Sequence, residues 1–115
     1  MRRLTRSGLL LLALAAPLQA ATFTGEVIDS FCYAKVGVRG PAHAACGIKC
    51  ARQGVPVALL EEKTRRVYVL LAPKDAEAVP PALVNQMGRT VLIEGETVVK
   101  GGTTFLVVRS FRVTR

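Results

Sequence analysis

The chain has 115 residues, enough for one small domain, and carries 16 lysines and arginines against eight aspartates and glutamates. It has no tryptophan, only two tyrosines and four phenylalanines, and no run of basic residues. This composition argues against a base-stacking surface or a basic tail for nucleic acid, so we expect no genomic nucleic-acid partner.

Residues 1–20 have the order of a secretory signal peptide. Arginines within residues 1–8 precede the apolar run 9–16, and the small residue Ala20 ends the segment. The run is shorter than the roughly 20 apolar residues that cross a bilayer. We therefore predict cleavage after Ala20, or one residue later, and a periplasmic or secreted protein whose mature chain has no membrane span. The paired arginines near the start leave Sec and twin-arginine export both open.

The mature chain, residues 21–115, is predicted to form one domain. Three of the 16 basic residues leave with the signal peptide, so the remaining 13 exceed the eight acidic residues by five. This charge fits a partner that is anionic or a protein of the cell envelope. Because a domain of this size buries a modest core, it gains from a disulfide or a metal, and an exported location permits either.

The first half of the mature chain begins with a strand. Apolar and polar residues alternate over 22–28, which predicts that strand, and glycines and a proline within 37–41 predict a loop after it. The alanine-rich stretch 42–52 predicts a short helix, with Gly54 just beyond its end.

The second half contains the remaining strands. Apolar runs predict strands over 55–60 and 67–71, joined by a polar turn. Residues 74–87 have a helical composition that Pro80 and Pro81 interrupt. Two long strands follow, and they cover 90–99, where Gly95 predicts a bulge, and 103–113.

This order predicts a mainly β fold. Five strands with one helix between the third and fourth is the order of an OB-fold barrel. The segment 29–54 then fills the connection between the first two strands, which OB barrels commonly use for ligands. The alternative is an open α+β sheet built from the same elements.

Three motifs stand in order along the chain, namely GEVIDSFCY, HAACGIKCARQGVPVALL and a GE…GG…VV close. This order resembles a group of small exported bacterial OB-fold-like domains of unknown function, over most of the mature chain. The resemblance implies the fold and brings no established activity. The matching positions are Gly25, Asp29, Cys32, His43, Cys46, Cys50, Gly54 and Pro56.

The segment 29–54 contains all three cysteines and the only histidine. On a helix, His43, Cys46 and Cys50 at i, i+3 and i+7 share one face, and Cys32 can fold over it. A Cys3His set suits zinc, and thiolates also suit cuprous copper. We predict a transition-metal site of these four residues, with a structural or metal-handling role, in which Asp29 accepts the His43 N–H.

A disulfide is the first alternative. Cys32 bonded to Cys46 or Cys50 would pin the loop to the helix and stabilise the domain by roughly 3 kcal/mol, leaving a spare thiol. The protein would then be an interaction module that holds a protein or polyanion through its loops or a basic strand. Three arginines alternate along that last strand, Arg109, Arg112 and Arg115, and Glu94 and Glu96 on the neighbouring strand are predicted to pair with them.

A thiol redox protein is the second alternative, because His43 can lower the pKa of the Cys46 thiol. Non-covalent haem ligation by His43 also stays open, whereas covalent attachment lacks its C-x-x-C-H motif. The sequence marks no oxyanion hole. We therefore expect a binding domain in preference to an enzyme.

Overall fold

The computed structural model describes residues 13–14 and 21–115. The predicted signal peptide, residues 1–20, falls outside the described residues except at its positions 13 and 14. Export and cleavage therefore stay predictions. Within the described residues, no helix combines the length and the apolar character that a bilayer crossing requires.

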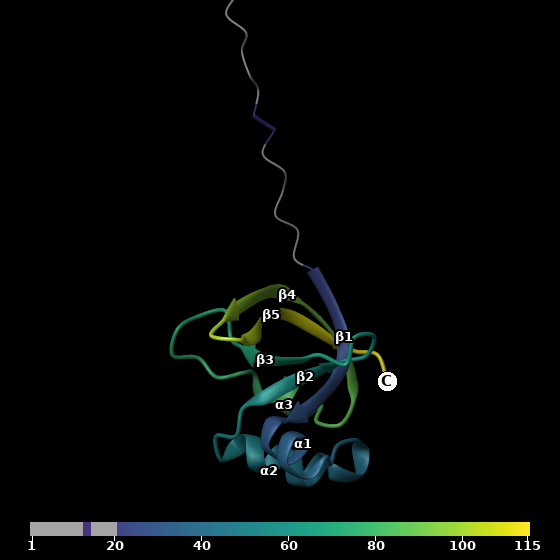
Figure 1. The fold of residues 1–115 in the computed structure, drawn as a ribbon. Coiled ribbons are helices and arrows are strands. Elements are labelled where there is room, and N and C mark those ends of the chain that lie inside the picture. The colour runs from purple at the N-terminus through teal and green to yellow at the C-terminus, as the bar shows by residue number, and fades with distance from the viewer. Residues whose placement is uncertain (1–12, 15–20) are drawn as a thin grey trace, which may run out of the picture.

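The described chain is mainly β, as predicted. Its five strands form one sheet that closes on itself in the order β1-β2-β3-β5-β4, and helices cover one end of this closed sheet (Figure 1). All neighbouring strands are antiparallel except β3 and β5, which are parallel. The elements are β1 (Ala21–Asp29), α1 (Ser30–Val36), the 3-10 helix η1 (Pro41–His43), α2 (Ala44–Arg52), β2 (Val57–Glu61), β3 (Val67–Leu71), α3 (Pro81–Val84), β4 (Thr90–Lys100) and β5 (Thr103–Val113).

The predicted strands are confirmed, with shifts of one or two residues at some ends. The predicted bulge is confirmed as well, since the pairing of β4 with β5 shifts register between Glu94 and Gly95. A Cβ atom at Gly95 would collide with the backbone oxygen of Val107. Glycine therefore lets the two strands approach closely where the sheet bends.

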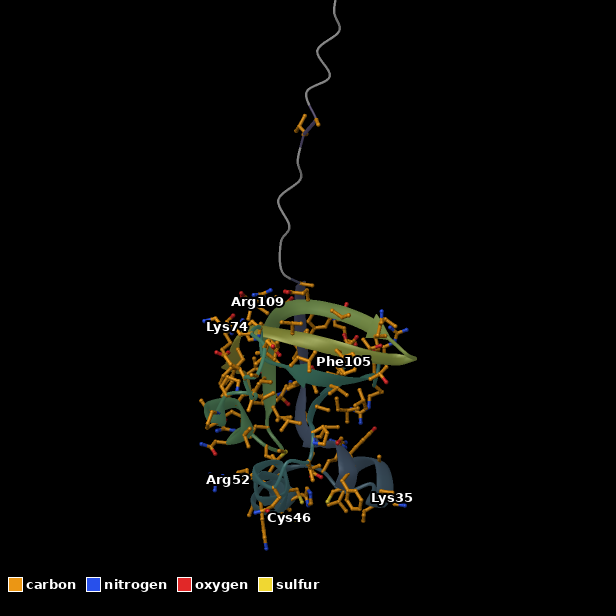
Figure 2. All side chains as sticks on the ribbon, turned by 90° about the vertical axis from the view of Figure 1, so that its left-hand side faces the viewer. Lys35, Cys46, Arg52, Lys74, Phe105 and Arg109 are labelled. Atoms are coloured by element: carbon orange, nitrogen blue, oxygen red, sulfur yellow. The ribbon has the colours of Figure 1, made fainter. Side chains whose placement is uncertain are left out.

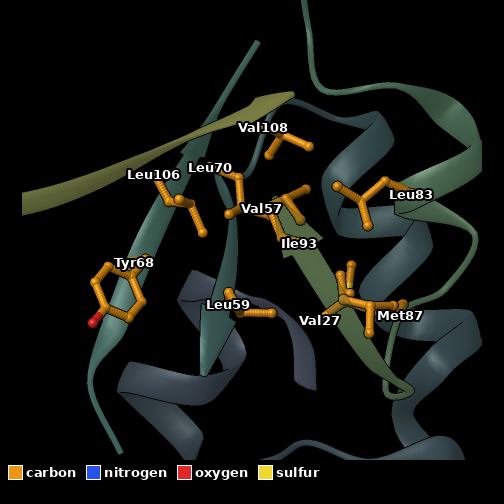
Figure 3. Close-up of a cluster of buried hydrophobic side chains, with 11 residues drawn as sticks. Val27, Val57, Leu59, Tyr68, Leu70, Leu83, Met87, Ile93, Leu106 and Val108 are labelled. Atoms are coloured by element: carbon orange, nitrogen blue, oxygen red, sulfur yellow. The ribbon is translucent and has the colours of Figure 1, made fainter. Parts of the chain in front are cut away.

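The interior of the closed sheet is filled by side chains from every strand. Leu59, Ile93 and Leu106 are fully buried there, and Leu83 of α3 and Met87 pack on the same cluster (Figure 3). This cluster fixes the end of β1, from which the cysteine-bearing segment departs. The sheet is thus the rigid support of that segment.

The predicted helix over 74–87 is wrong for most of its length. Only α3, Pro81–Val84, is α-helical in this stretch. Pro80 is extended, with ψ 137°, because a proline disfavours helical geometry in the residue before it. Pro81 then occupies the first turn of the helix, where a missing N–H costs nothing.

The predicted loop after β1 is also partly wrong, because residues 30–36 form helix α1. Asp29 caps its N-terminus by accepting the backbone N–H of Cys32 at 2.8 Å. Gly37, at φ 75°, ends it with the left-handed geometry that glycine tolerates. An aspartate followed eight residues later by glycine was the sequence sign of this helix.

The buried hydroxyl of Tyr68, which donates to Glu61 Oε2 at 2.9 Å, allows a test of the sheet. We expect Tyr68→Phe to lower the free energy of unfolding by about 1 kcal/mol near neutral pH. Burial and the Glu61 carboxylate raise the pKa of Tyr68. Its contribution is therefore present below pH about 10 and lost as pH rises through the raised folded-state pKa. Urea unfolding against pH measures this, and equal alkaline declines in both proteins would contradict it.

Candidate metal centre

The connection between β1 and β2 is a helical cap made of α1, η1 and α2 (Figure 1). It begins at Asp29, the last residue of β1, whose side chain is only 1% exposed. Because the Asp29 carboxylate caps α1, Cys32 is held in the first turn of that helix. The ion pair of Arg39 with Glu26, at 2.9 Å, ties the following loop back to β1.

The second half of the cap carries the other predicted site residues. His43 ends η1 and is the residue before α2, on which Cys46 and Cys50 lie one turn apart. The change from 3-10 to α-helix at Ala44 means that His43 does not continue the regular helical spacing expected from the sequence. Cys46 and Cys50 nevertheless share one face of α2.

The structure brings all three cysteines together. The Sγ atoms of Cys32, Cys46 and Cys50 lie within 4.8 Å of one another, and all three cysteines are free thiols. Cys32 and Cys50 are half-buried, whereas Cys46 is exposed. One α1 residue and two α2 residues thus present three sulfurs at a point open to solvent on one side. We call these three residues the thiol cluster.

A second group joins the thiol cluster at Cys32. Ligand atoms of Asp29, Cys32 and His43 also lie within 4.8 Å of one another. As predicted, Asp29 contacts the histidine, with 2.8 Å between Asp29 Oδ2 and His43 Nε2. The four residues predicted as ligands therefore form two groups that share Cys32, and His43 belongs to the group that contains Asp29.

The charge of Asp29 determines which nitrogen of His43 is protonated. Burial alone would raise the pKa of Asp29, but hydrogen bonds from the Cys32 backbone and from His43 outweigh it and lower the pKa. An ionised carboxylate only accepts hydrogen bonds, so His43 Nε2 carries the proton that Asp29 Oδ2 accepts. In the neutral ring, Nδ1 then keeps a free lone pair and is the atom able to bind a metal.

The environments of Cys32 and Cys50 favour protonated sulfur. Burial, followed by the nearby Asp29 carboxylate, raises the pKa of Cys32 to about 12. Burial and the neighbouring Cys46 also raise the pKa of Cys50. A nucleophilic cysteine needs a lowered pKa, so Cys32 and Cys50 are poor candidates for a nucleophile. A metal ion would have to displace these protons.

The predicted basic stripe on β5 lies apart from the thiol cluster. Figure 2 shows Cys46, Lys35 and Arg52 at the helical end of the domain and Arg109 on the sheet, away from it. Arg109 pairs with Glu96, as predicted, with 2.5 Å between Nη2 and Oε1, and Arg115 pairs with Glu62. Exposed pairs of this kind add little stability, but they reduce the free positive charge that the stripe offers to an anionic partner.

Gly47, between the two cysteines of α2, was not singled out from the sequence. It is the buried residue of that helix, and a Cβ atom there would lie 2.6 Å from Met87 Cγ and 3.2 Å from Asp29 Oδ2. Glycine usually weakens a helix interior. Here it lets α2 approach the core and Asp29 closely enough to bring Cys46 and Cys50 to Cys32.

We therefore expect Gly47→Ala to lower the free energy of unfolding by about 1 kcal/mol. Crowding of buried Met87 costs roughly 1–3 kcal/mol, which exceeds the gain of roughly 0.5–1 kcal/mol in helix propensity. The matched control is Ala45→Gly, at an exposed position of the same helix, where glycine has only its propensity cost. Urea unfolding compares them, and a stabilised Gly47→Ala variant would contradict the packing argument.

Comparison of the chain with protein-family models, with curated proteins and with solved structures finds no match. The candidate metal centre therefore stands on its own geometry.

Proposed function

We propose that this protein is an exported domain that binds one transition-metal ion, zinc or copper, at the thiol cluster, and that it serves the cell envelope in a structural or metal-handling role. Cys32, Cys46 and Cys50 supply three ligands, and His43 Nδ1 is the candidate for a fourth. Asp29 orients the His43 ring from its other side, as carboxylates commonly do for metal-binding histidines.

The observation that carries this proposal is the convergence of three free sulfurs from two separate helices within 4.8 Å. Thiolates and imidazole are the ligands that zinc and copper prefer. Asp29 fixes the positions of Cys32 and His43 at once, through two different carboxylate oxygens. Such positioning of ligands before metal arrives lowers the ordering cost of binding.

The proposal includes export and an OB-like barrel. The order of residues 1–20, basic, then apolar, then ending in the small residue Ala20, supports export with cleavage after Ala20. The strand order and the position of α3 between β3 and β4 support an OB-like fold. N-terminal sequencing of the protein from a periplasmic fraction should give Ala21 as the first residue. A chain that keeps residues 1–20 would remove the export part of the proposal.

Metal analysis tests the central claim. Protein purified from the periplasm without chelators is expected to carry about one zinc or copper per chain. Cys46→Ser removes one sulfur from the exposed side of the cluster and should reduce this content to a small fraction. Ala45→Ser adds a hydroxyl on the same helix without touching the cluster, and should keep the wild-type content.

Equal and negligible metal in all three proteins would overturn the proposal. Counting free thiols on the same samples identifies the disulfide alternative, because one free thiol per chain indicates a staple. Three thiols that react only after a chelator is added indicate a metal site.

A further inference from the structure

We infer that the thiol cluster is a three-coordinate site for cuprous copper, formed by Cys32, Cys46 and Cys50 alone, with His43 held by Asp29 and not a ligand. This inference rests on the proposed function and names its metal and coordination number.

The spacing of the sulfurs fits three bonds in one plane. Metal–sulfur bonds of about 2.3 Å place three sulfurs about 4.0 Å apart around a central ion. The three Sγ atoms already lie within 4.8 Å of one another. Small side-chain rotations of two cysteines on α2 and one on α1 therefore complete the site, and no helix has to move.

The number of ligands in the cluster favours copper over zinc. Soft thiolates bind both metals, but structural zinc sites are almost always four-coordinate, and the cluster offers three sulfurs. Over residues 21–115, the group of three sulfurs includes no carboxylate or imidazole. His43 lies within 4.8 Å of Cys32 but does not group with all three sulfurs. Its contact with Asp29, at 2.8 Å, fixes its ring.

The charge of the cap also matches a copper–thiolate site. Cuprous copper with three thiolates carries a net charge of minus two, one unit more negative than zinc with three thiolates and a neutral imidazole. Between Asp29 and Pro56 the chain has two lysines and two arginines against one acidic residue, Asp29 itself, which contacts the cluster at Cys32. Four basic residues minus one acidic residue give this stretch a net charge of plus three. Lys49 stands between Cys46 and Cys50 in α2. A local excess of cations stabilises an anionic centre.

Exposure of Cys46 gives the ion a route in and out. Copper arriving as a complex with a small thiol exchanges that thiol for Cys46 first, and the half-buried Cys32 and Cys50 follow. In that exchange the Cu–S bond to the small thiolate breaks as the bond to Cys46 forms, and the thiol proton goes to the departing thiolate. Each further Cu–S bond, to Cys32 and to Cys50, releases one thiol proton to water. Copper stays in the cuprous state, and no oxidant or reductant is needed.

The test is a pair of anaerobic titrations of the mature chain, one with Cu⁺ and one with Zn²⁺, each against a chromophoric chelator. Copper X-ray absorption then counts the ligands. We expect one Cu⁺ per chain with three sulfurs and no nitrogen, and an affinity loss above about 100-fold in Cys46→Ser, since even changes to residues behind the ligands cost roughly 10- to 100-fold. The matched control is Ala45→Ser.

His43→Gln separates the two coordination schemes, because the glutamine amide still offers Asp29 an N–H but has no imidazole nitrogen. We expect it to bind Cu⁺ within about threefold of wild type, well under the roughly tenfold lower limit for an essential metal-site residue. Zinc bound through three sulfurs and one nitrogen, and lost in His43→Gln, would overturn the inference and leave the proposed function standing. Binding of both ions no tighter than in the variant with all three cysteines changed to serine would overturn both.

Discussion

Asp29→Ala is expected to lower the free energy of unfolding by about 2–4 kcal/mol. The change removes the cap of α1, which is worth roughly 0.5–2 kcal/mol. It also leaves the half-buried His43 Nε2–H without its acceptor, which costs roughly 1–3 kcal/mol. Both losses destabilise the helical connection made of α1, η1 and α2, because Asp29 joins the end of β1 to Cys32 and to His43. Chemical denaturation of the metal-free protein measures the change.

Asp29→Asn is the matched control, since asparagine has the same shape as aspartate. It has only one acceptor oxygen, however, whereas the two carboxylate oxygens of Asp29 accept from the Cys32 N–H and from His43 Nε2. We expect a smaller loss, about 1–2 kcal/mol. If the oxygen stays on the Cys32 N–H, the amide nitrogen faces His43, and the ring proton moves from Nε2 to Nδ1. Nitrogen-15 NMR of the histidine ring detects that change. An unchanged stability in both Asp29 variants would contradict the role of Asp29 as the anchor of the cap.

The β framework could be predicted because it depends on local patterns. Alternation of apolar and polar residues identified β1, and the bulge at Gly95 followed from a glycine inside a strand. Helix α1 was missed because it has no buried residue, so no hydrophobic period marks it. Its caps, Asp29 and Gly37, define it instead. Of the helix predicted over 74–87, only four residues are α-helical, because the two prolines disfavour helix more than the composition of the stretch favours it.

The candidate metal centre could be predicted only as far as the spacing of cysteines and histidine along the chain restricts the positions of their side chains. The spacing predicted that the sulfurs of Cys46 and Cys50 meet Cys32, and that Asp29 accepts from His43, and the structure has both contacts. It did not predict the 3-10 turn starting at Pro41, after which His43 groups with Asp29 and Cys32 and not with all three sulfurs. The fit of Gly47 against Met87 depends on residues forty positions apart, and a single sequence contains no trace of such a contact.

Metal binding itself is expected to have the largest effect on stability. The ion links α1, through Cys32, to α2, through Cys46 and Cys50, and the unfolded chain does not hold the three sulfurs together. At a free metal concentration about 1,000 times the dissociation constant, binding stabilises the folded state by about 4 kcal/mol. For a domain of this size, we expect the midpoint of thermal unfolding to rise by more than about 15 °C.

Cys32→Ser should abolish this rise, because it removes the one sulfur that α1 contributes while Cys46 and Cys50 remain on α2. Scanning calorimetry of the mature chain with Cu⁺ under anaerobic conditions, or with Zn²⁺, measures the midpoint before and after addition of a chelator. Ala45→Ser is the matched control and should keep the full rise. An equal rise in Cys32→Ser would mean that the ion binds α2 alone, and the cap would then be held together by Asp29 without help from the metal.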